Sequence, residues 1–407
     1  MKIIKCRNCK SYKLSNLFSF GKISFTGKFP RSKGKNIKKA PLELVICGSC
    51  KLVQLKHDYS LKYLYGSDYG YRTGINKTMT EHVKNVTKTL VKKTKLGKND
   101  HVLDIASNDG TLLNFYPKTS ITFGIDPVID KYKKNYKNIN FKISDFFSRR
   151  KILRKTKNKF KIISALSVFY DLKYPNKFMR DVEKLLERNG IALIEFADLA
   201  SMIKFNMFDA ICHEHITYYS SKIVSEIAKK NNLRVFDIKY NNINGGSSQY
   251  YICKKNSIHK NNMVSLKKIS KLEKKLELEN KQTYIKFFSR VRKIKSKINN
   301  FIKKNKSKNK SIHGYGASTK GNVLLQYFDI DKKHINFVAD RNPEKFGCYT
   351  PGSKIPIISE KKSRKLKPDF YLVLPWHFKK EILKRERKTI LKGSKFIFPL
   401  PNLKIYK

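Results

Sequence analysis

Two pairs of closely spaced cysteines near the start of the chain restrict its fold more than any other feature. The segments CRNC and CGSC place Cys6 with Cys9 and Cys47 with Cys50. Each pair can direct two thiolates at one tetrahedral ion, so together they can close a Zn²⁺ site. Such a site has no open coordination position and stabilises the chain without acting as a catalyst. We predict a structural zinc-binding module over residues 1–70.

The cysteine content also indicates the compartment. Seven cysteines, an odd number with four grouped in pairs, argue against a disulfide framework and for a reducing environment. The longest apolar runs fall short of the ~18 residues of a membrane span, and the first residues lack the apolar segment of a signal peptide. We therefore expect a cytoplasmic protein without a membrane span.

The formal net charge of +58 is the strongest departure in composition. Such a charge invites a nucleic-acid interpretation. However, the excess is mostly lysine, is spread along the chain and accompanies abundant Asn and Ile, which an AT-rich coding sequence explains. The sequence also lacks an arginine-rich arm, a zinc-finger recognition helix and an RNA-binding aromatic motif. We do not expect a nucleic-acid partner, although a basic surface would favour phosphorylated substrates.

The middle of the chain alternates apolar runs with helical segments, as an α/β domain does. We assign residues 71–254 to this domain, with a helix over 178–190 that ends on Gly190 and a late antiparallel pair formed by LRVFDIKY and QYYICKK. The five earlier predicted strands are 101–105, 121–126, 139–144, 161–166 and 191–196.

Residues 255–407 are expected to hold a connecting helix and a second α/β unit. Apolar residues at helical spacing, without Pro or Gly, predict one long helix over 263–302 with a solvated charged face. A lysine-rich linker follows. The strand-like segments beyond it are SIHGYGA, INFVADRNP, DFYLVLPW and KFIFPLP.

A strand, a short polar loop and a predicted helix follow one another in VLDIASNDGTLLNFY, residues 102–116. That context suits a nucleotide-type cofactor at the carboxyl end of a strand. The loop lacks the G-x-G-x-x-G spacing that brings backbone against a pyrophosphate, so it suits S-adenosylmethionine better than a dinucleotide. In the alternative interpretation the loop is an ordinary turn, and Asp109 only caps the helix.

Several side chains are candidates for binding this cofactor. Asp104 can face the methionyl amino group, and Gly110 permits close approach by the cofactor. Asp126, 22 residues after Asp104, sits where a carboxylate binds ribose hydroxyls. Asp145 and Phe146, after the third strand, could cover the adenine. The other predicted cofactor contacts are Ser107, Asn108, Asp109, Pro127 and Ser167.

Ten segments, taken in order, resemble the sugar C-methyltransferases, which build branched deoxysugars. The resemblance spans essentially the whole chain. It implies an α/β fold with a zinc-binding N-terminal domain, a class I (Rossmann-like) methyltransferase core and a C-terminal α/β domain. The segments are CRNC with CGSC, LVQL, DYGYRTG, VLDIASNDGTLL, GIDP, ICHEHITYYS, INGGSSQYY, GYGASTKGN, VADRNPEKFGCYTPGSKIPI and PDFYLVLPWHF.

The resemblance implies methylation of a nucleotide-linked 4-keto-deoxyhexose at the carbon beside the ketone. Such a reaction needs a base for a proton next to a carbonyl, and histidine suits this role because its pKa lies near working pH. By resemblance His215 is the base, Glu214 is its partner or that of a sugar hydroxyl, and Tyr69 is a phenol that faces the sugar. The further predicted substrate contacts are Tyr71, His213, Asp171 and Lys320, the last in a phosphate cradle.

Three positions depart from the family pattern. Cys212 replaces a tyrosine, Ser167 replaces an asparagine and Asp171 replaces a histidine. These departures leave open which sugar is used and whether a carbon or an oxygen is methylated. O-methylation in surface-polysaccharide synthesis would also use His215 as base.

Three other functions stay open at this point. The charge and the zinc module favour an RNA methyltransferase, but the chain has no catalytic cysteine pair and no NPPY-like loop. A non-catalytic scaffold in an envelope-sugar gene cluster would need neither the intact SNDG loop (residues 107–110) nor the HEH segment (residues 213–215). A catalytic zinc could be held by His213 and His215, but no further ligand stands at a recognisable spacing.

Overall fold

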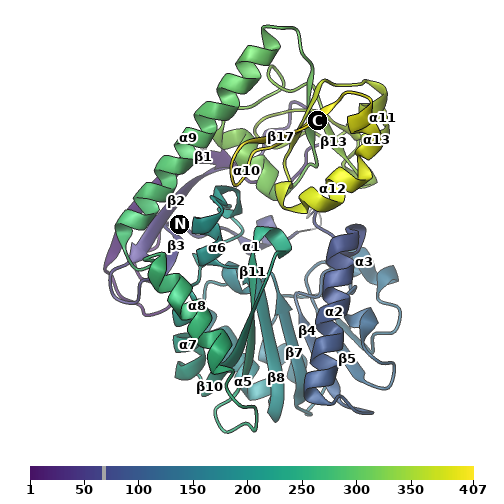
Figure 1. Cartoon of the computed structure of the whole chain (residues 1–407). Coiled ribbons are helices and arrows are strands. Elements are labelled where there is room, and N and C mark those ends of the chain that lie inside the picture. Colours follow the sequence, from purple (N-terminus) through teal and green to yellow (C-terminus); the bar gives the residue numbers. More distant parts are fainter. Residues whose placement is uncertain (67–69) are drawn as a thin grey trace.

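Three β-sheets divide the chain in the computed structural model, which describes residues 1–66 and 70–407 (Figure 1). The N-terminal sheet has the strand order β1-β2-β3-β9. Its last strand comes from the ICHEHITYYS segment and begins 162 residues after the end of β3 (217 − 55). The strands are β1 (Leu14–Ser24), β2 (Lys39–Cys47), β3 (Val53–Leu55) and β9 (Thr217–Tyr218).

The central sheet has the order β10-β11-β8-β7-β4-β5-β6, in which only β11 runs antiparallel to its neighbours. This order agrees with the Rossmann-like core that the sequence resemblance implies. The strands are β4 (His101–Ile105), β5 (Ile121–Ile125), β6 (Phe141–Ile143), β7 (Phe160–Leu166), β8 (Leu186–Ala197), β10 (Leu233–Asn241) and β11 (Ser247–Lys254).

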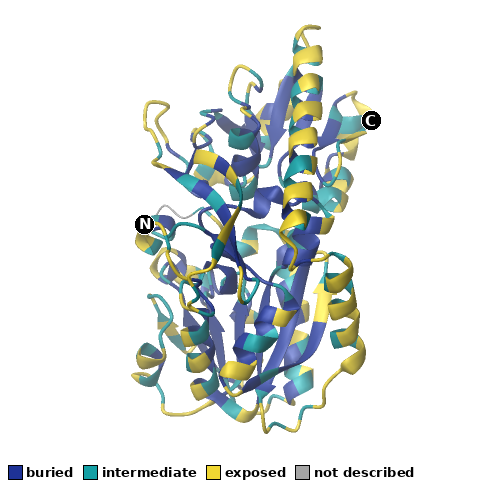
Figure 2. Ribbon diagram, turned by 90° about the vertical axis from the view of Figure 1, so that its left-hand side faces the viewer, coloured by how far each residue is buried: buried dark blue, intermediate teal, exposed yellow. Residues whose placement is uncertain are grey.

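Helices cover both faces of this sheet, which leaves its strands buried (Figure 2). α2 (Lys77–Thr94) packs on one face through Val83, Val86 and Leu90. α5 (Pro175–Leu185) and α7 (Ser221–Lys230) pack on the other face. Cys6 and Cys47, one from each cysteine pair, belong to the same apolar cluster. Shorter helices are α1 (Leu61–Leu64), α3 (Ile129–Tyr132), α4 (Arg149–Leu153) and α6 (Leu199–Lys204).

The C-terminal sheet has the order β14-β13-β12-β15-β16-β17, with only β17 antiparallel. Its strands are β12 (Ile312–Tyr315), β13 (Val338–Asp340), β14 (Ile357–Ser359), β15 (Phe370–Val373), β16 (Lys395–Phe398) and β17 (Lys404–Tyr406). Its helices are α10 (Thr319–Tyr327), α11 (Glu360–Lys365), α12 (Lys379–Arg385) and α13 (Arg387–Leu391).

Two helices, α8 (Met263–Lys275) and α9 (Lys281–Lys306), connect the central and C-terminal domains. α9 runs diagonally along the N-terminal sheet (Figure 1) and buries a stripe that starts at Tyr284 and ends at Ile302. Phe18 of β1 stacks on Phe288 with ring centroids 4.5 Å apart. The N-terminal sheet, α9 and the C-terminal domain therefore share one hydrophobic core.

Three local predictions are wrong. The single helix over 263–302 is two helices, because Glu277 has a φ of 49° and Asn280 caps α9 by accepting from the Gln282 N–H. The helix predicted over 178–190 is α5, which already ends at Leu185. Gly190 lies instead in a bulge of β8. The helix expected after the 106–110 loop is only a 3₁₀ turn, η2 (Leu113–Phe115).

Within the described residues, none of the helices combines the length and the hydropathy that crossing a bilayer requires.

Candidate active site

A cavity of about 420 Å³ is enclosed by the central and C-terminal domains. The loops that follow β4, β5 and β7 line one side, and the loops that follow β12, β13 and β15 line the other. Carboxyl ends of parallel strands are where α/β proteins bind their ligands. The cavity is therefore the candidate active site.

The loop after β4 has an unusual backbone. Ala106, Asn108 and Gly110 have φ values of 59°, 51° and 75°. A side chain on Gly110 would meet the Tyr136 ring at 3.0 Å, so glycine is required there. The Tyr136 hydroxyl supports the loop by donating to the Asn108 carbonyl and by hydrogen-bonding the Ser107 hydroxyl, both at 2.8 Å. Strained backbone of this kind is typical of ligand-binding loops.

Two predicted cofactor carboxyls lie together in the cavity. Asp126 accepts from the Asn108 N–H at 3.0 Å and from the Val128 N–H at 2.9 Å, which fixes it against the loop. Asp104 accepts from the Ser164 hydroxyl at 2.6 Å. Burial, reinforced by the Asp126 charge, raises the pKa of Asp104 to about 7. The two groups thus form an acidic end of the cavity that a cationic ligand would stabilise.

Most other predicted cofactor contacts also line the cavity: Ser107, Asn108, Pro127, Phe146 and Ser167. Asp109 and Gly110 do not, because Asp109 turns to the segment before α2. It accepts from the Gly74 N–H at 3.0 Å and forms an ion pair with Arg72 at 3.2 Å. Asp145 is also outside the cavity, where it pairs with Lys151 and lies partly exposed.

The HEH segment is held from two sides. The Leu55 N–H of the zinc-binding module donates to the Ile216 carbonyl, and the Ile216 N–H donates to the Tyr170 carbonyl, both at 2.9 Å. His213 lies outside the cavity, between the rings of Phe25 and Tyr59, where it hydrogen-bonds the Ala40 carbonyl. The other two residues of the HEH segment, Glu214 and His215, line the cavity.

The His215 ring has a defined tautomer. Its Nδ1 lies 2.8 Å from the Ala210 carbonyl oxygen, which can only accept, so Nδ1 carries the proton and Nε2 carries the lone pair. The ring also packs on Tyr170 at a centroid distance of 4.0 Å. Burial lowers the pKa of His215 to about 3. The imidazole is therefore neutral near pH 7, and its unprotonated nitrogen is Nε2.

The predicted substrate contacts Tyr71, Asp171 and Lys320 line the cavity, whereas Tyr69 lies outside the described residues. Lys320 donates to the Asn244 carbonyl at 2.8 Å. Burial lowers its pKa, and the charge of Asp209 counteracts this.

Several residues that line the cavity were missed in the sequence, and they come from the C-terminal domain. Asp340 accepts from the Ala317 N–H at 2.6 Å and from the Asn342 N–H at 2.7 Å, which repeats the bonding of Asp126. In the sequence, the first strands of the central and C-terminal domains are each followed by a loop and a predicted helix. That similarity was the signal from which Asp340 could have been predicted. His377 is a second case, and burial lowers its pKa well below the usual value.

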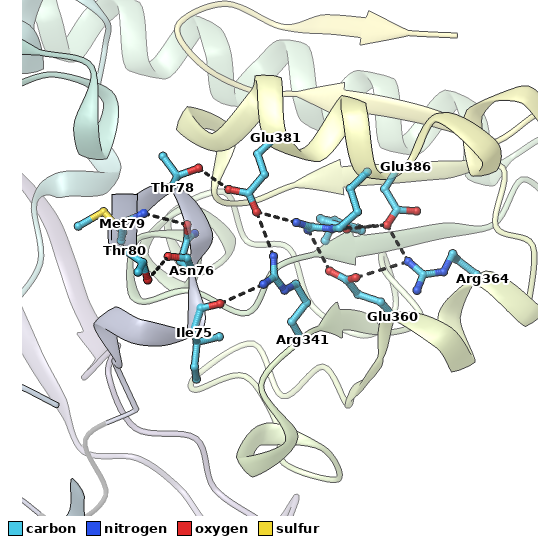
Figure 3. Close-up of polar contacts among 12 residues, drawn as sticks. Ile75, Asn76, Thr78, Met79, Thr80, Arg341, Glu360, Arg364, Glu381 and Glu386 are labelled. Carbon is cyan, nitrogen blue, oxygen red and sulfur yellow. Dashed lines mark hydrogen bonds and ion pairs between the residues drawn. The ribbon is translucent and has the colours of Figure 1, made fainter. Parts of the chain in front are cut away.

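An ion-pair network joins the C-terminal domain to the first turn of α2 and to the segment before it (Figure 3). Glu381 accepts from Arg341 at 3.0 Å, from Arg385 at 2.8 Å and from the Thr78 hydroxyl. Arg341 also donates to the Ile75 carbonyl at 3.0 Å. These bonds close one wall of the cavity across the domain boundary.

We expect Arg341→Ala to weaken this closure modestly. The Arg341–Glu381 ion pair is partly exposed, and such pairs contribute about 0.2–1 kcal/mol. The KM for the ligand bound in the cavity should therefore rise by no more than about fivefold. Steady-state kinetics would measure the change. Arg364→Ala is the control, because Arg364 pairs with Glu360 and Glu386 inside the C-terminal domain. An equal rise of KM in both variants would contradict the role given to the interdomain bonds.

The four cysteines of the predicted zinc site lie together. All four sulfur atoms are within 4.8 Å of one another, with Cys6–Cys50 at 3.6 Å and Cys9–Cys47 at 3.5 Å. Zn–S bonds of about 2.3 Å in a tetrahedron place sulfurs about 3.8 Å apart. The cluster therefore fits a structural Zn²⁺ ion.

Comparisons with known proteins match three consecutive segments. Residues 6–65 match a zinc binding domain, 75–238 a methyltransferase domain and 242–401 the C-methyltransferase C-terminal domain. The C-methyltransferase NovU of Streptomyces niveus is 25% identical over 99% of this chain and 97% of its own length.

Solved structures are matched more distantly. Magnesium protoporphyrin IX methyltransferase from Synechocystis PCC 6803, with bound SAM, is 13% identical, covers 47% of this chain and 88% of its own, and has a TM-score of 0.34. The N-methyltransferase NodS from Bradyrhizobium japonicum WM9 is 14% identical, covers 44% of this chain and 98% of its own, and has a TM-score of 0.33.

Proposed function

Since the chain is a methyltransferase with the zinc-binding, methyltransferase and C-methyltransferase C-terminal domains of the C-methyltransferase family, we propose that it methylates a nucleotide-linked ketodeoxysugar in the cytoplasm. The methylated atom is the carbon next to the ketone, and His215 removes its proton. S-adenosylmethionine supplies the methyl group.

The observation that carries this proposal is the state of His215. Its Nδ1–H is bound to the Ala210 carbonyl, which leaves the Nε2 lone pair as the proton acceptor in the cavity. The free imidazole is a weak base because burial lowers its pKa to about 3. A negative enolate nearby raises the pKa of a cationic acid, so proton transfer becomes easier as the carbanion character develops. The Ala210 carbonyl stabilises the imidazolium that results.

Basic side chains on the C-terminal side of the cavity suit the diphosphate of the substrate. Lys320 and Lys345 follow β12 and β13, and Lys345 donates to the Ala317 carbonyl at 2.7 Å. A nucleotide that reaches these residues would extend from the C-terminal domain towards His215. This orientation supports a sugar carried on a nucleoside diphosphate.

The proposal also assigns Asp126 to the cofactor ribose. Asp126→Ala should lower the affinity for S-adenosylhomocysteine about 10- to 100-fold, because a charged hydrogen bond contributes about 1.5–3 kcal/mol. Isothermal titration calorimetry measures this directly. Asp145→Ala is the matched control, because Asp145 lies outside the cavity, and its affinity should stay within about twofold. Unchanged binding by Asp126→Ala would contradict the assignment.

The function is tested by incubating the protein with methyl-labelled S-adenosylmethionine and a panel of nucleotide-linked 4-keto sugars. We expect label in the sugar, on a carbon, as product analysis by NMR would show. Label on an oxygen would identify a sugar O-methyltransferase. If the sugars stayed unlabelled and RNA in a parallel incubation became labelled, the sugar assignment would be wrong.

A further inference from the structure

Two buried carboxyl groups in the cavity each have an oxygen without a hydrogen-bond partner in the described part of the chain. Asp171 is 7% exposed and Glu214 is 4% exposed. Asp171 Oδ1 and Glu214 Oε1 are the unpartnered atoms. Native proteins pair nearly all buried polar atoms, so an unpaired one in a cavity points to a missing ligand.

The other oxygen of each group is bound by a neutral hydroxyl. Tyr65 donates to Asp171 Oδ2 at 2.7 Å, and Thr26 donates to Glu214 Oε2 at 3.2 Å. Neither carboxyl has an ion pair with a residue in 1–66 or 70–407. Each pKa is raised, chiefly by burial, and the charge of Glu214 raises that of Asp171 further. Two buried carboxylates without a cation are costly, and a positive ligand offsets that cost.

Each lysine or arginine that lines the cavity contacts groups other than Asp171 and Glu214. Arg72 pairs with Asp109, Arg341 and Arg385 pair with Glu381, and Lys345 donates to the Ala317 carbonyl. Lys320 donates to the Asn244 carbonyl. In the described part of the chain, no lysine or arginine of the cavity thus balances Asp171 and Glu214, so a bound ligand must supply a positive group for them.

We propose that Asp171 and Glu214 form an acidic subsite that binds a protonated amino group on the sugar ring. This inference rests on the proposed sugar substrate and narrows it to a nucleotide-linked amino-ketodeoxysugar. An ammonium group offers three N–H donors, enough for both unpaired oxygens, and carries the compensating charge. A hydroxyl offers one donor and no charge. Asp171 is thus a specificity-determining residue.

The test compares two nucleotide-linked 4-keto-deoxysugars that differ only in carrying an amino or a hydroxyl group at one ring carbon. The wild-type enzyme should favour the amino sugar by about 10- to 100-fold in kcat/KM, as charge-assisted hydrogen bonds predict. This comparison needs no variant. Equal use of both sugars, or preference for the hydroxyl sugar, would overturn the subsite and leave the proposed function intact.

Asp171→Asn provides the residue-level test. It should lower kcat/KM for the amino sugar at least about tenfold more than kcat/KM for the hydroxyl sugar, so that the preference for the amino sugar falls. Asp329→Asn, at a carboxylate that is 78% exposed, is the control and should change neither. An equal loss on both sugars would overturn the specificity role. If S-adenosylmethionine binds but neither sugar is methylated by the wild-type enzyme, the proposed function fails and the subsite fails with it.

Discussion

Removal of zinc is expected to abolish methyl transfer and to unfold the N-terminal module. The four-cysteine site holds the two cysteine pairs together. The strand β3, which follows the second pair, is hydrogen-bonded to β9, and β9 begins two residues after His215. The knuckle residues Cys6 and Cys47 also belong to the core of the central sheet. Loss of the ion would therefore release the strand on which the HEH segment is supported.

The size of this effect follows from zinc energetics. Structural zinc sites in isolated modules contribute on the order of 10 kcal/mol of folding free energy. We expect the melting temperature to fall by more than about 10 °C, since 1 kcal/mol shifts it by about 2–4 °C in larger domains. Scanning calorimetry before and after dialysis against a chelator measures this shift, and added Zn²⁺ should restore activity.

Single-residue variants separate the metal from general damage. Cys6→Ser should reproduce the effect of chelation, whereas Cys348→Ser should not, because Cys348 is buried in another hydrophobic core and is not one of the four clustered cysteines. Zinc-free protein that keeps its melting temperature and its turnover would show that the four cysteines do not support the site.

Replacement of His215 is the second change with a large expected effect. His215→Ala should lower kcat about 10²- to 10⁴-fold, the usual contribution of a general base. Affinity for S-adenosylhomocysteine should stay unchanged, because His215 belongs to the HEH segment and not to the loops after β4 and β5. Single-turnover assays and calorimetry measure the two quantities.

A second variant and a control make the result specific. His215→Asn keeps a donor that can reach the Ala210 carbonyl but has no basic nitrogen, so it should be as slow as His215→Ala. His334→Ala removes a partly exposed histidine that pairs with Asp331 and should have wild-type kinetics. Full turnover by His215→Asn would mean that the ring acts only through its bond to Ala210.

The sequence allowed one side of the cavity to be predicted because that side is built from local segments. Strand, loop and next strand follow one another in the chain, so Asp104 and Asp126 could be placed at adjacent strand ends. The zinc site was equally accessible, since the cysteine spacing alone encodes it. The HEH segment came from the resemblance, and its side chains diverge: Glu214 and His215 line the cavity, whereas His213 packs between aromatic rings.

The remaining features depend on tertiary contacts that no local pattern reveals. Asp109 reads as a loop residue of the cofactor site, but it binds Arg72 and the Gly74 N–H. β9 is only two residues long and forms because β3 lies beside it. Gly190 looked like a helix cap because glycine is common there, yet pairing of β8 with β7 takes precedence.

Deuterium exchange tests the central claim, proton removal by His215, most directly. The enzyme and a nucleotide-linked 4-keto sugar are incubated in deuterated water without S-adenosylmethionine, and NMR follows the carbon next to the ketone. The wild-type enzyme should exchange the proton at this carbon, and His215→Ala should not. Exchange by His215→Ala at the wild-type rate would contradict the assignment of His215 as the base.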